Sequence, residues 1–476
     1  MFRNYLTRLI IPAFVVAALA MLAWWFFFNP VSNFTVSVPG MDNRRKGKAS
    51  GGAPVKIGAE FKFFKNQDDL PGTRWPRFRG DDFDNICKEK IHLIDHWGKN
   101  GPVILWKLAV GDGHAAPAVY QGKVYLLDYD EVKKTDQLRC LSLATGEELW
   151  RRGYLVHLKR NHGLSRTIPA VSDKFVLTIG PRCQVMCVKR NNGDFLWGID
   201  LEKEYSTEIP FWYTGQCPML DHDTAIIATG GKALLIAVDC NTGKKVWETL
   251  NPRGWKMSHS SVMPMVFNGK KMYVYAAIGG VCGISAGGAD RGRILWETGA
   301  FAPSVVAPSP VILDNGKVFI TAGYGAGSAL LRVSGGEGRY RVEILQMFKP
   351  QEGLASEQQT PIFSGGYLYG ILPKDAGGLR NQLVCCKAGD CKNIVMSSGK
   401  TDRFGLGPYM MADGKLFILN DDGEMTIASF SPSRFTTLDK ARIIDGQDSW
   451  GPMVITGGYL LMRDSKQMVC LDIKAR

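Results

Sequence analysis

Short apolar runs, each followed by a turn rich in glycine or proline, make up most of the chain and predict β-strands rather than helices. A proline that follows small or polar residues and precedes an apolar run recurs at intervals of 44 to 52 residues. Five or six residues after most of these prolines, a glycine precedes a strand with an aromatic side chain, as at residues 122–125 and 316–319. The prolines are Pro117, Pro169, Pro218, Pro264, Pro310, Pro361, Pro408 and Pro452.

A third feature of the repeat is a Thr-Gly or Asn-Gly turn that leads into a strand ending in tryptophan. It occupies residues 140–150, 187–197 and 237–247, and a degenerate copy ends at Trp296. Each repeat therefore contains four predicted strands joined by turns, which is typical of one blade of a β-propeller.

The last repeat stops short of its final strand. It ends at residues 468–473 without the segment that leads to tryptophan, whereas a strand of that type, residues 104–106, precedes the first proline. We expect this early strand to complete the last blade, because closure of the ring removes open sheet edges. The sequence thus predicts an all-β fold, an eight-bladed β-propeller of four-stranded blades over residues 102–476.

The N-terminus has a different pattern. Residues 9–28 contain no charge and follow Arg3 and Arg8, which predicts a helix that spans a membrane and is retained as a signal anchor over residues 1–28. The alternative is a signal peptide cleaved after Ala20, which would leave a strongly apolar mature N-terminus. The anchor predicts a single-pass protein of the inner (cytoplasmic) membrane, with the propeller in the periplasm or otherwise outside the cytoplasm.

Two segments separate the anchor from the repeats. Residues 29–70 show no period and are rich in Gly, Lys and Ser, so we expect a flexible tether. Residues 71–101 are expected to cap the underside of the propeller, with Trp75 and Phe78 packing on it.

Charge and cysteine content add two expectations. The net charge of +13 includes a cluster at residues 44–48, which favours attraction to acidic lipid headgroups or simple solvation over nucleic-acid binding. Among the 11 cysteines, Cys140, Cys187 and Cys470 occupy the same position of different repeats. This position predicts small core side chains rather than disulfides. If a disulfide forms, the adjacent pair at residues 385–386 is the expected place.

Sequence motifs ahead of the repeats are found in a known family. A Trp-Pro-x-Phe-Arg-Gly motif at residues 75–80 is followed by Trp and Gly-Pro at residues 97–102 and by Leu-Trp at 105–106. With these motifs, residues 74–476 resemble the PQQ-like β-propeller repeat family, which includes the assembly lipoprotein BamB and the quinoprotein alcohol dehydrogenases. The likeness is greatest to exported propellers of planctomycetes and verrucomicrobia. One departure is residues 356–359, where similar proteins carry a His-Gly-rich stretch.

The candidate binding site lies in the loops that connect each tryptophan strand to the next repeat, because these loops line the funnel of a propeller. Three of them are long and concentrate cationic, imidazole and aromatic groups, which suit an anionic, flat or glycan-like ligand. The alternative is that these groups plug the channel and satisfy one another. The candidates are His162, Arg166, Glu208, Trp212, Trp255 and His259.

Two functions remain open at this stage. The first is a non-catalytic binding or scaffold module of the cell envelope, with a protein or glycan partner. The second, implied by the resemblance, is an oxidoreductase like the quinoprotein alcohol dehydrogenases, with PQQ and Ca²⁺ as cofactors. No Cys-x-x-Cys-His haem motif occurs, and no catalytic residue or metal ligand can be assigned from the sequence. We therefore expect the first function.

Overall fold

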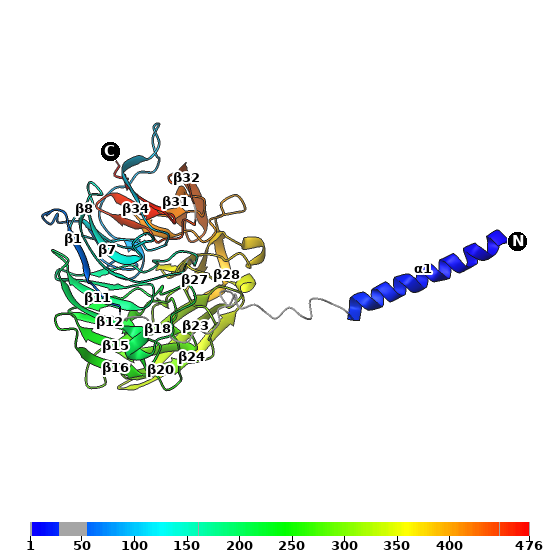
Figure 1. The fold of residues 1–476 in the computed structure, drawn as a ribbon, viewed down its shortest axis with the longest axis horizontal. Coiled ribbons are helices and arrows are strands. Elements are labelled where there is room, and N and C mark those ends of the chain that lie inside the picture. The colour runs from blue at the N-terminus through cyan, green and yellow to red at the C-terminus, as the bar shows by residue number, and fades with distance from the viewer. Residues whose placement is uncertain (1, 28–54, 160, 447, 476) are drawn as a thin grey trace. The chain divides into compact units, whose positions relative to one another are not determined.

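Eight β-sheets form the body of the protein. The computed structural model describes residues 2–27, 55–159, 161–446 and 448–475, with side chains in the first segment from residue 12 onward. It divides the chain into two units, residues 1–53 and 54–476. The sheets all belong to the second unit and follow one another around a ring, each contributing one blade (Figure 1). The predicted eight-bladed propeller of four-stranded blades is confirmed.

The strands of the first four blades follow one another along the chain. Blade 1 contains β5 (Ala118–Tyr120), β6 (Lys123–Asp130), β7 (Thr135–Ser142) and β8 (Glu148–Leu155). Blade 2 contains β9 (Ala170–Val171), β10 (Phe175–Ile179), β11 (Gln184–Lys189) and β12 (Phe195–Asp200). Blade 3 contains β13 (Met219–Asp221), β14 (Thr224–Ala228), β15 (Ala233–Asp239) and β16 (Lys245–Leu250). Blade 4 contains β17 (Met263–Phe267), β18 (Lys270–Ala277), β19 (Gly280–Ser285) and β20 (Ile294–Thr298). A short helix α2 (Leu201–Tyr205) follows β12.

The other four blades complete the ring. Blade 5 contains β21 (Val311–Ile312), β22 (Lys317–Ala322), β23 (Gly327–Gly336) and β24 (Arg339–Phe348). Blade 6 contains β25 (Ile362–Ser364), β26 (Tyr367–Ile371), β27 (Leu383–Lys387) and β28 (Asp390–Ser397). Blade 7 contains β29 (Tyr409–Ala412), β30 (Lys415–Leu419), β31 (Glu424–Ser431) and β32 (Arg434–Arg442). Blade 8 contains β33 (Val454–Thr456), β34 (Tyr459–Arg463), β35 (Gln467–Asp472) and β4 (Val103–Ala109). Short 3-10 helices lie at Pro350–Glu352 and Gly377–Leu379.

The last blade closes the ring with a strand from the start of the repeats. Strand β4 pairs antiparallel with β35, and Trp106 lies opposite Cys470 in the register. Closure therefore joins residues more than 360 positions apart, as predicted from the missing final strand.

The tryptophan at the end of a repeat packs on the glycine turn of the following blade. A methyl group added at Gly193 would lie 2.6 Å from the ring of Trp150, and one added at Gly243 would lie 2.7 Å from Trp197. The indole of Trp197 also donates to the Cys240 carbonyl oxygen at 2.8 Å. Glycine at these turns thus provides both the positive φ and the space for the neighbouring indole. This packing explains the repeated Gly-to-Trp spacing.

The cysteines behave as core side chains. Cys140, Cys187 and Cys470 each lie opposite a tryptophan in the sheet register and are fully buried. All eleven cysteines are free thiols in the structure. The expected place for a disulfide is wrong for a geometric reason: Cys385 and Cys386 are successive residues of β27, so their side chains belong to different core clusters.

The segment before the repeats is more ordered than predicted. Residues 29–54 of the expected tether lie outside the described residues. Residues 60–63, however, form β1 (Glu60–Phe63), which pairs with β8 and adds an outer strand to blade 1. The phenyl ring of Phe61 lies under the Arg152 guanidinium, 4.1 Å from ring centroid to Cζ. The tether prediction is therefore wrong for this stretch, because aromatic side chains attach it to the propeller.

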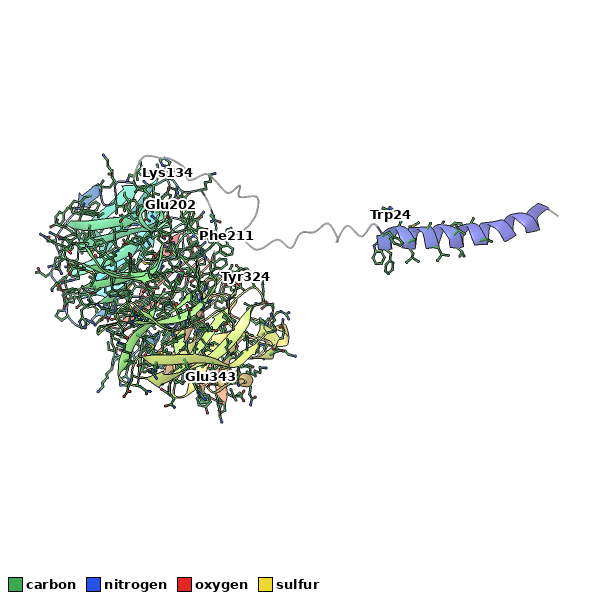
Figure 2. The ribbon with its side chains drawn as sticks, turned by 90° about the horizontal axis from the view of Figure 1, so that it is seen from below. Trp24, Lys134, Glu202, Phe211, Tyr324 and Glu343 are labelled. Carbon is green, nitrogen blue, oxygen red and sulfur yellow. The ribbon has the colours of Figure 1, made fainter. Side chains whose placement is uncertain are left out.

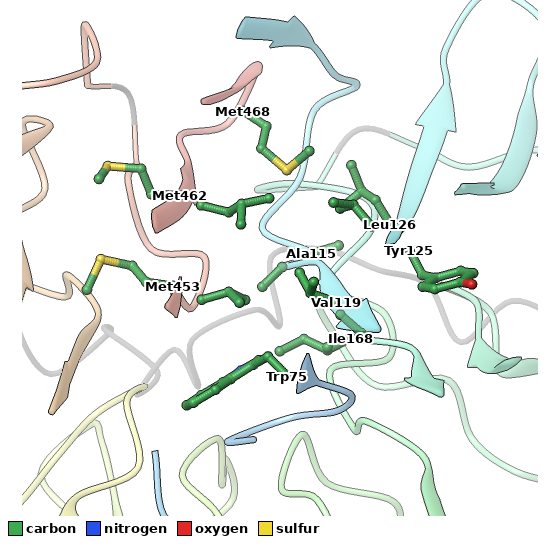
Figure 3. Packing of buried hydrophobic residues seen from close by; sticks show 14 of the residues in the cluster. Trp75, Ala115, Val119, Tyr125, Leu126, Ile168, Met453, Met462 and Met468 are labelled. Atoms are coloured by element: carbon green, nitrogen blue, oxygen red, sulfur yellow. The ribbon is translucent and has the colours of Figure 1, made fainter. Parts of the chain in front are cut away.

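Residues 71–101 pair with the innermost strands of two blades. Strand β2 (Arg74–Trp75) pairs with β5, and β3 (Ile86–Cys87) pairs parallel with β29, so the segment reaches from blade 1 to blade 7. Trp75 is only 4% exposed and lies beside Val119 and Ile168 in the core (Figure 3).

The N-terminal unit contains helix α1 (Phe2–Phe27). From Phe14 to Phe27 its large apolar side chains are exposed. Within the described residues, no helix reaches the length and apolarity needed to cross a membrane. The predicted helix is therefore present, whereas the predicted membrane span is not confirmed.

Candidate functional site

A cavity of about 340 Å³ lies where the loops between successive blades converge. These loops connect the outer strand of one blade to the inner strand of the next, and the hairpins of blades 5 and 6 join them with Tyr324 and Lys374. Both kinds of connection emerge at the same end of a four-stranded antiparallel blade, which is why they meet here. We call this end the mouth and the end covered by residues 71–101 the base.

Side chains that precede the repeat prolines link the blades around the channel. The amide of Cys217 donates to Ser261 Oγ at 3.0 Å, that of Ser261 to Ser309 Oγ at 2.9 Å, and that of Ser309 to Thr360 Oγ1 at 2.9 Å. Each bond joins one blade to the next. The small or polar residues before the prolines are therefore required by the inter-blade hydrogen bonds.

Arg79 closes the base of the channel. Its side chain donates to the carbonyl oxygens of Phe83, Thr360, Asp84 and Pro361 at 2.7–3.0 Å. The residue is 4% exposed, and burial lowers its pKa to about 10. Hydrogen bonds to the four carbonyl oxygens replace those that the guanidinium loses to water on burial. Phe78, next to it, forms part of the cavity wall, so the cap packs on the propeller and also contributes to the site.

The structure brings four of the six predicted candidates to the cavity: His162, Arg166, Trp212 and His259. The other two lie elsewhere. Glu208 is at the exposed rim, where its side chain is 68% exposed and pairs with Lys256 Nζ at 2.7 Å. Trp255 is a core residue instead: it is 6% exposed, and methyl groups added at Gly279 and Gly280 would lie 2.4 and 2.3 Å from its ring.

Aromatic rings form two stacked pairs in the cavity wall. The rings of Trp212 and Tyr324 are 5.9 Å apart at an interplanar angle of 11°, and those of His114 and Trp450 are 5.1 Å apart at 29°. The ring centroids of His259 and Trp212 are 6.0 Å apart. Figure 2 shows Tyr324 on the same side of the propeller as Phe211, the neighbour of Trp212 in sequence. The first pair joins the loop between blades 2 and 3 to a hairpin of blade 5, and the second joins the loops on either side of blade 8, so both pairs depend on the closed ring.

The two buried imidazoles are uncharged at neutral pH. Burial, and then the nearby positive charge of Arg166, lowers the pKa of His259 to about 3 and that of His114 to about 3. His114 Nε2 lies 3.2 Å from the carbonyl oxygen of His162, and its buried Nδ1 has no hydrogen-bond partner among the residues that the structure describes. These rings can therefore exchange neutral hydrogen bonds with a ligand.

Arg166 carries positive charge into the cavity. A terminal nitrogen donates to the carbonyl oxygens of Asn161 and His162, whereas the buried Nε has no acceptor within the described part of the chain. Burial lowers the pKa of Arg166 to about 10, so the side chain stays charged at neutral pH.

Sequence reasoning missed several wall residues. Glu357 and Gln359 lie just before Pro361, and Trp450 just before Pro452, so they occupy the loop position that predicted the other candidates. Had the shorter loops between blades been included as funnel-lining segments, these residues would have been predicted. Tyr324 and Lys374 come from hairpins within blades, which that prediction did not include.

The described cavity wall does not offer the set of ligands that Ca²⁺ requires. Calcium takes six to eight oxygen ligands, usually with several carboxylates. Glu357 supplies the one carboxylate of the described cavity wall, and the described residues contain no group of three or more His, Cys, Asp or Glu side chains placed to hold a metal ion. Gln359, which could offer an amide oxygen, uses its Nε2 to donate to the Trp450 carbonyl oxygen at 2.9 Å.

Comparisons with known proteins agree with this architecture. Residues 134–391, more than half of the chain, match the family model described as outer membrane protein assembly factor BamB. No curated protein matches the chain.

Among solved structures, BamB from Moraxella catarrhalis has a TM-score of 0.50 at 10% identity, over 78% of this chain and 100% of that chain. A europium-containing methanol dehydrogenase has a TM-score of 0.53 at 13% identity, over 84% of this chain and 89% of that chain. The designed protein Ika8 has a TM-score of 0.50 at 12% identity, over 78% and 99%. At such identities the likeness concerns the fold alone.

Proposed function

Because the chain belongs to the family of PQQ-like propellers described as outer membrane protein assembly factor BamB, we propose that it is a non-catalytic binding or scaffold module of the cell envelope. The match from blade 1 into blade 6 is the observation that carries this proposal. The cavity supports it, since its wall combines aromatic platforms with polar groups of both signs. Such a wall is suited to recognition rather than to quinone chemistry.

The apolar helix α1 supplies the means of attachment in this proposal. Its exposed phenylalanine and tryptophan side chains are unfavourable in water, so the helix associates with the inner membrane and the propeller lies outside the cytoplasm. An envelope protein or a glycan is then within reach of the mouth.

The envelope role is tested in cells that lack the chain. We expect less folded outer-membrane β-barrel protein in their membranes, measured by heat-modifiability on gels. The full chain should restore the level, and a variant without residues 1–53 should restore it poorly, because it is not held at the membrane. Unchanged β-barrel levels in the cells without the chain would argue against an assembly role.

The quinoprotein alternative is tested by titrating the full chain with PQQ and Ca²⁺. We expect no saturable rise in melting temperature, since the wall offers Ca²⁺ one carboxylate. A rise that requires both cofactors would instead assign the protein to the oxidoreductases, because only a ligand that binds the folded state stabilises it.

A further inference from the structure

Glu357 is an acidic side chain of the cavity wall with an unsatisfied carboxyl group. The residue is 8% exposed, and its carboxyl group makes no hydrogen bond or ion pair with any residue that the structure describes. A methyl group added at Gly323 would lie 2.3 Å from Glu357 Cγ, so the backbone of Gly323 holds the stem of the side chain in place. The carboxyl oxygens of Glu357 face the cavity, where a ligand that donates hydrogen bonds can satisfy them.

Among the described residues, no ion pair joins the positive groups of the same wall to a carboxylate. Arg166 Nε is buried and lacks an acceptor, and Lys374 lines the cavity without an ion pair to Glu357 in the described residues. A ligand with a net negative charge would be attracted to Arg166 and Lys374 but repelled by an ionised Glu357, and a cationic ligand would meet the opposite balance. The carboxyl groups of Asp375 and Asp421 also act on Glu357, so groups of both signs surround this part of the cavity. A neutral ligand that both donates and accepts hydrogen bonds can satisfy groups of both signs.

The aromatic pairs restrict the shape of this ligand. Tyr324 is 42% exposed and stacks on Trp212, so the pair offers a broad apolar surface that flat or C–H-rich rings can cover. The neutral imidazole of His259 lies beside it. A cavity of about 340 Å³ falls at the lower end of the range for small-molecule sites, about 300–1,000 Å³.

We propose that the cavity binds an uncharged saccharide ring, as a free sugar or as the end of a glycan. A C–H face of the ring packs on Trp212 and Tyr324, hydroxyl groups donate to Glu357, and other hydroxyl groups accept from Arg166 and Lys374. This inference rests on the proposed function as a binding module and chooses a glycan, rather than a protein, as the occupant of the cavity.

The first test is a charge series on one ring. The probes are N-acetyl-D-glucosamine, which is neutral, D-glucosamine, which is cationic, and D-glucuronate, which is anionic. D-Glucose and its epimers D-galactose and D-mannose serve as further neutral sugars. The full chain is kept in a polyoxyethylene detergent, because maltoside detergents would compete. Binding is followed by indole fluorescence and saturation-transfer NMR. We expect at least one neutral sugar to bind at least tenfold more tightly than both charged probes. Preference for a charged probe, or no binding of any neutral sugar, overturns the proposal.

The second test locates the sugar with matched variants. Glu357→Gln and Tyr324→Leu should each weaken binding of the neutral sugar about tenfold or more, the effect of losing one good contact of about 1.4 kcal/mol. Glu343→Gln on the outer strand β24 and Tyr459→Leu on β34 should change it less than twofold. Circular dichroism and melting curves of all four proteins confirm that they fold. Equal binding by the cavity variants and the wild type would place any sugar elsewhere and refute the site.

Failure here is distinguishable from failure of the envelope role. If no sugar binds but cells without the chain still lose outer-membrane β-barrel protein, the cavity proposal is wrong and a protein partner is favoured. If a sugar binds in the cavity but the membranes are unaffected, the assembly role is wrong and the binding site remains.

Discussion

At the base of the central channel, the guanidinium of Arg79 donates to four backbone carbonyl oxygens, whereas at the mouth the carboxyl group of Glu357 has no partner among the described residues. Both residues are almost fully buried, at 4% and 8% exposure. Burial therefore does not explain the difference. At the base, the charged Arg79 binds the cap to the propeller. At the mouth, the carboxyl group of Glu357 is free to bind a ligand.

This contrast separates structural from binding roles within one channel. A polar group that is satisfied within the protein gains little from a ligand, whereas an unsatisfied one gains the full hydrogen bond. The inter-blade hydrogen bonds beside the repeat prolines resemble the base in this respect, as between the Ser261 amide and Ser309 Oγ. A ligand is therefore expected at the mouth.

The largest effect is expected from Arg79→Met. The substitution keeps most of the side-chain volume but leaves four carbonyl oxygens without donors, and we expect a loss of about 3 kcal/mol or more in the free energy of unfolding. Denaturation by urea measures it. The exposed Arg434→Met on β32 serves as the control and should cost less than about 0.5 kcal/mol. Equal stability of the two variants would show that the hydrogen bonds of Arg79 contribute no more to the free energy of unfolding than the exposed Arg434 does.

A smaller loss is expected at the blade interfaces. Gly193 and Gly269 have nearly the same backbone, with φ of 72° and 73°, but only Gly193 lies against an indole, and Gly269 has open space around it. Gly269→Ala should cost about 1–2 kcal/mol for the left-handed conformation. Gly193→Ala should cost about 1–3 kcal/mol more, because its methyl group overlaps Trp150.

The difference between the two alanine variants isolates the tryptophan contact, since the backbone term is common to both. Melting temperatures of the full-length proteins are sufficient to measure it. Identical losses would mean that the indole moves aside at little cost and that this interface is looser than the spacing of its atoms indicates.

Most of the fold could be predicted because each blade has the same local requirements. A proline after a small residue, a glycine turn and a terminal tryptophan each correspond to one contact, such as Trp150 on Gly193, so a repeated motif indicates a repeated contact. Strand β1 escaped prediction because its attachment depends on Phe61 packing under Arg152 of blade 1. Nothing in the local sequence indicates that partner.

The site was predictable only in part because a loop position does not determine the direction of a side chain. Trp255 lies in a predicted loop, but the absence of side chains at Gly279 and Gly280 leaves space that its ring fills in the core. Glu208 is held at the rim by Lys256. Conversely, Tyr324 reaches the cavity from a hairpin of blade 5, and its stacking partner Trp212 is more than 100 residues away. Such pairs follow from ring closure rather than from sequence spacing.

The smallest change in stability, with the opposite sign to that of Arg79→Met, is expected from Glu357→Gln. Burial raises the pKa of Glu357, so the folded protein retains the proton to a higher pH than the unfolded chain does. Between these two pKa values the unfolded chain binds fewer protons, and the stability of the wild type falls as the pH rises through that interval. Glutamine has no proton to lose, so the variant should lack this decline and be more stable at pH 8 by about 0.5 kcal/mol.

Urea midpoints between pH 4.5 and 8 measure the slope, and Glu343→Gln, whose side chain is 59% exposed, is the matched control that should keep the wild-type slope. If Glu357→Gln destabilises the protein at every pH, the carboxyl group has a stabilising partner in the folded state. The polar groups at the mouth are then as well satisfied by hydrogen bonds as those at the base. If the substitution stabilises the protein only at the higher pH, the ionised carboxylate of Glu357 has no stabilising partner in the folded wild type. Addition of a bound neutral sugar should then restore the stability of the wild type at pH 8 more than that of the variant, because only the wild type has an ionised acceptor to satisfy.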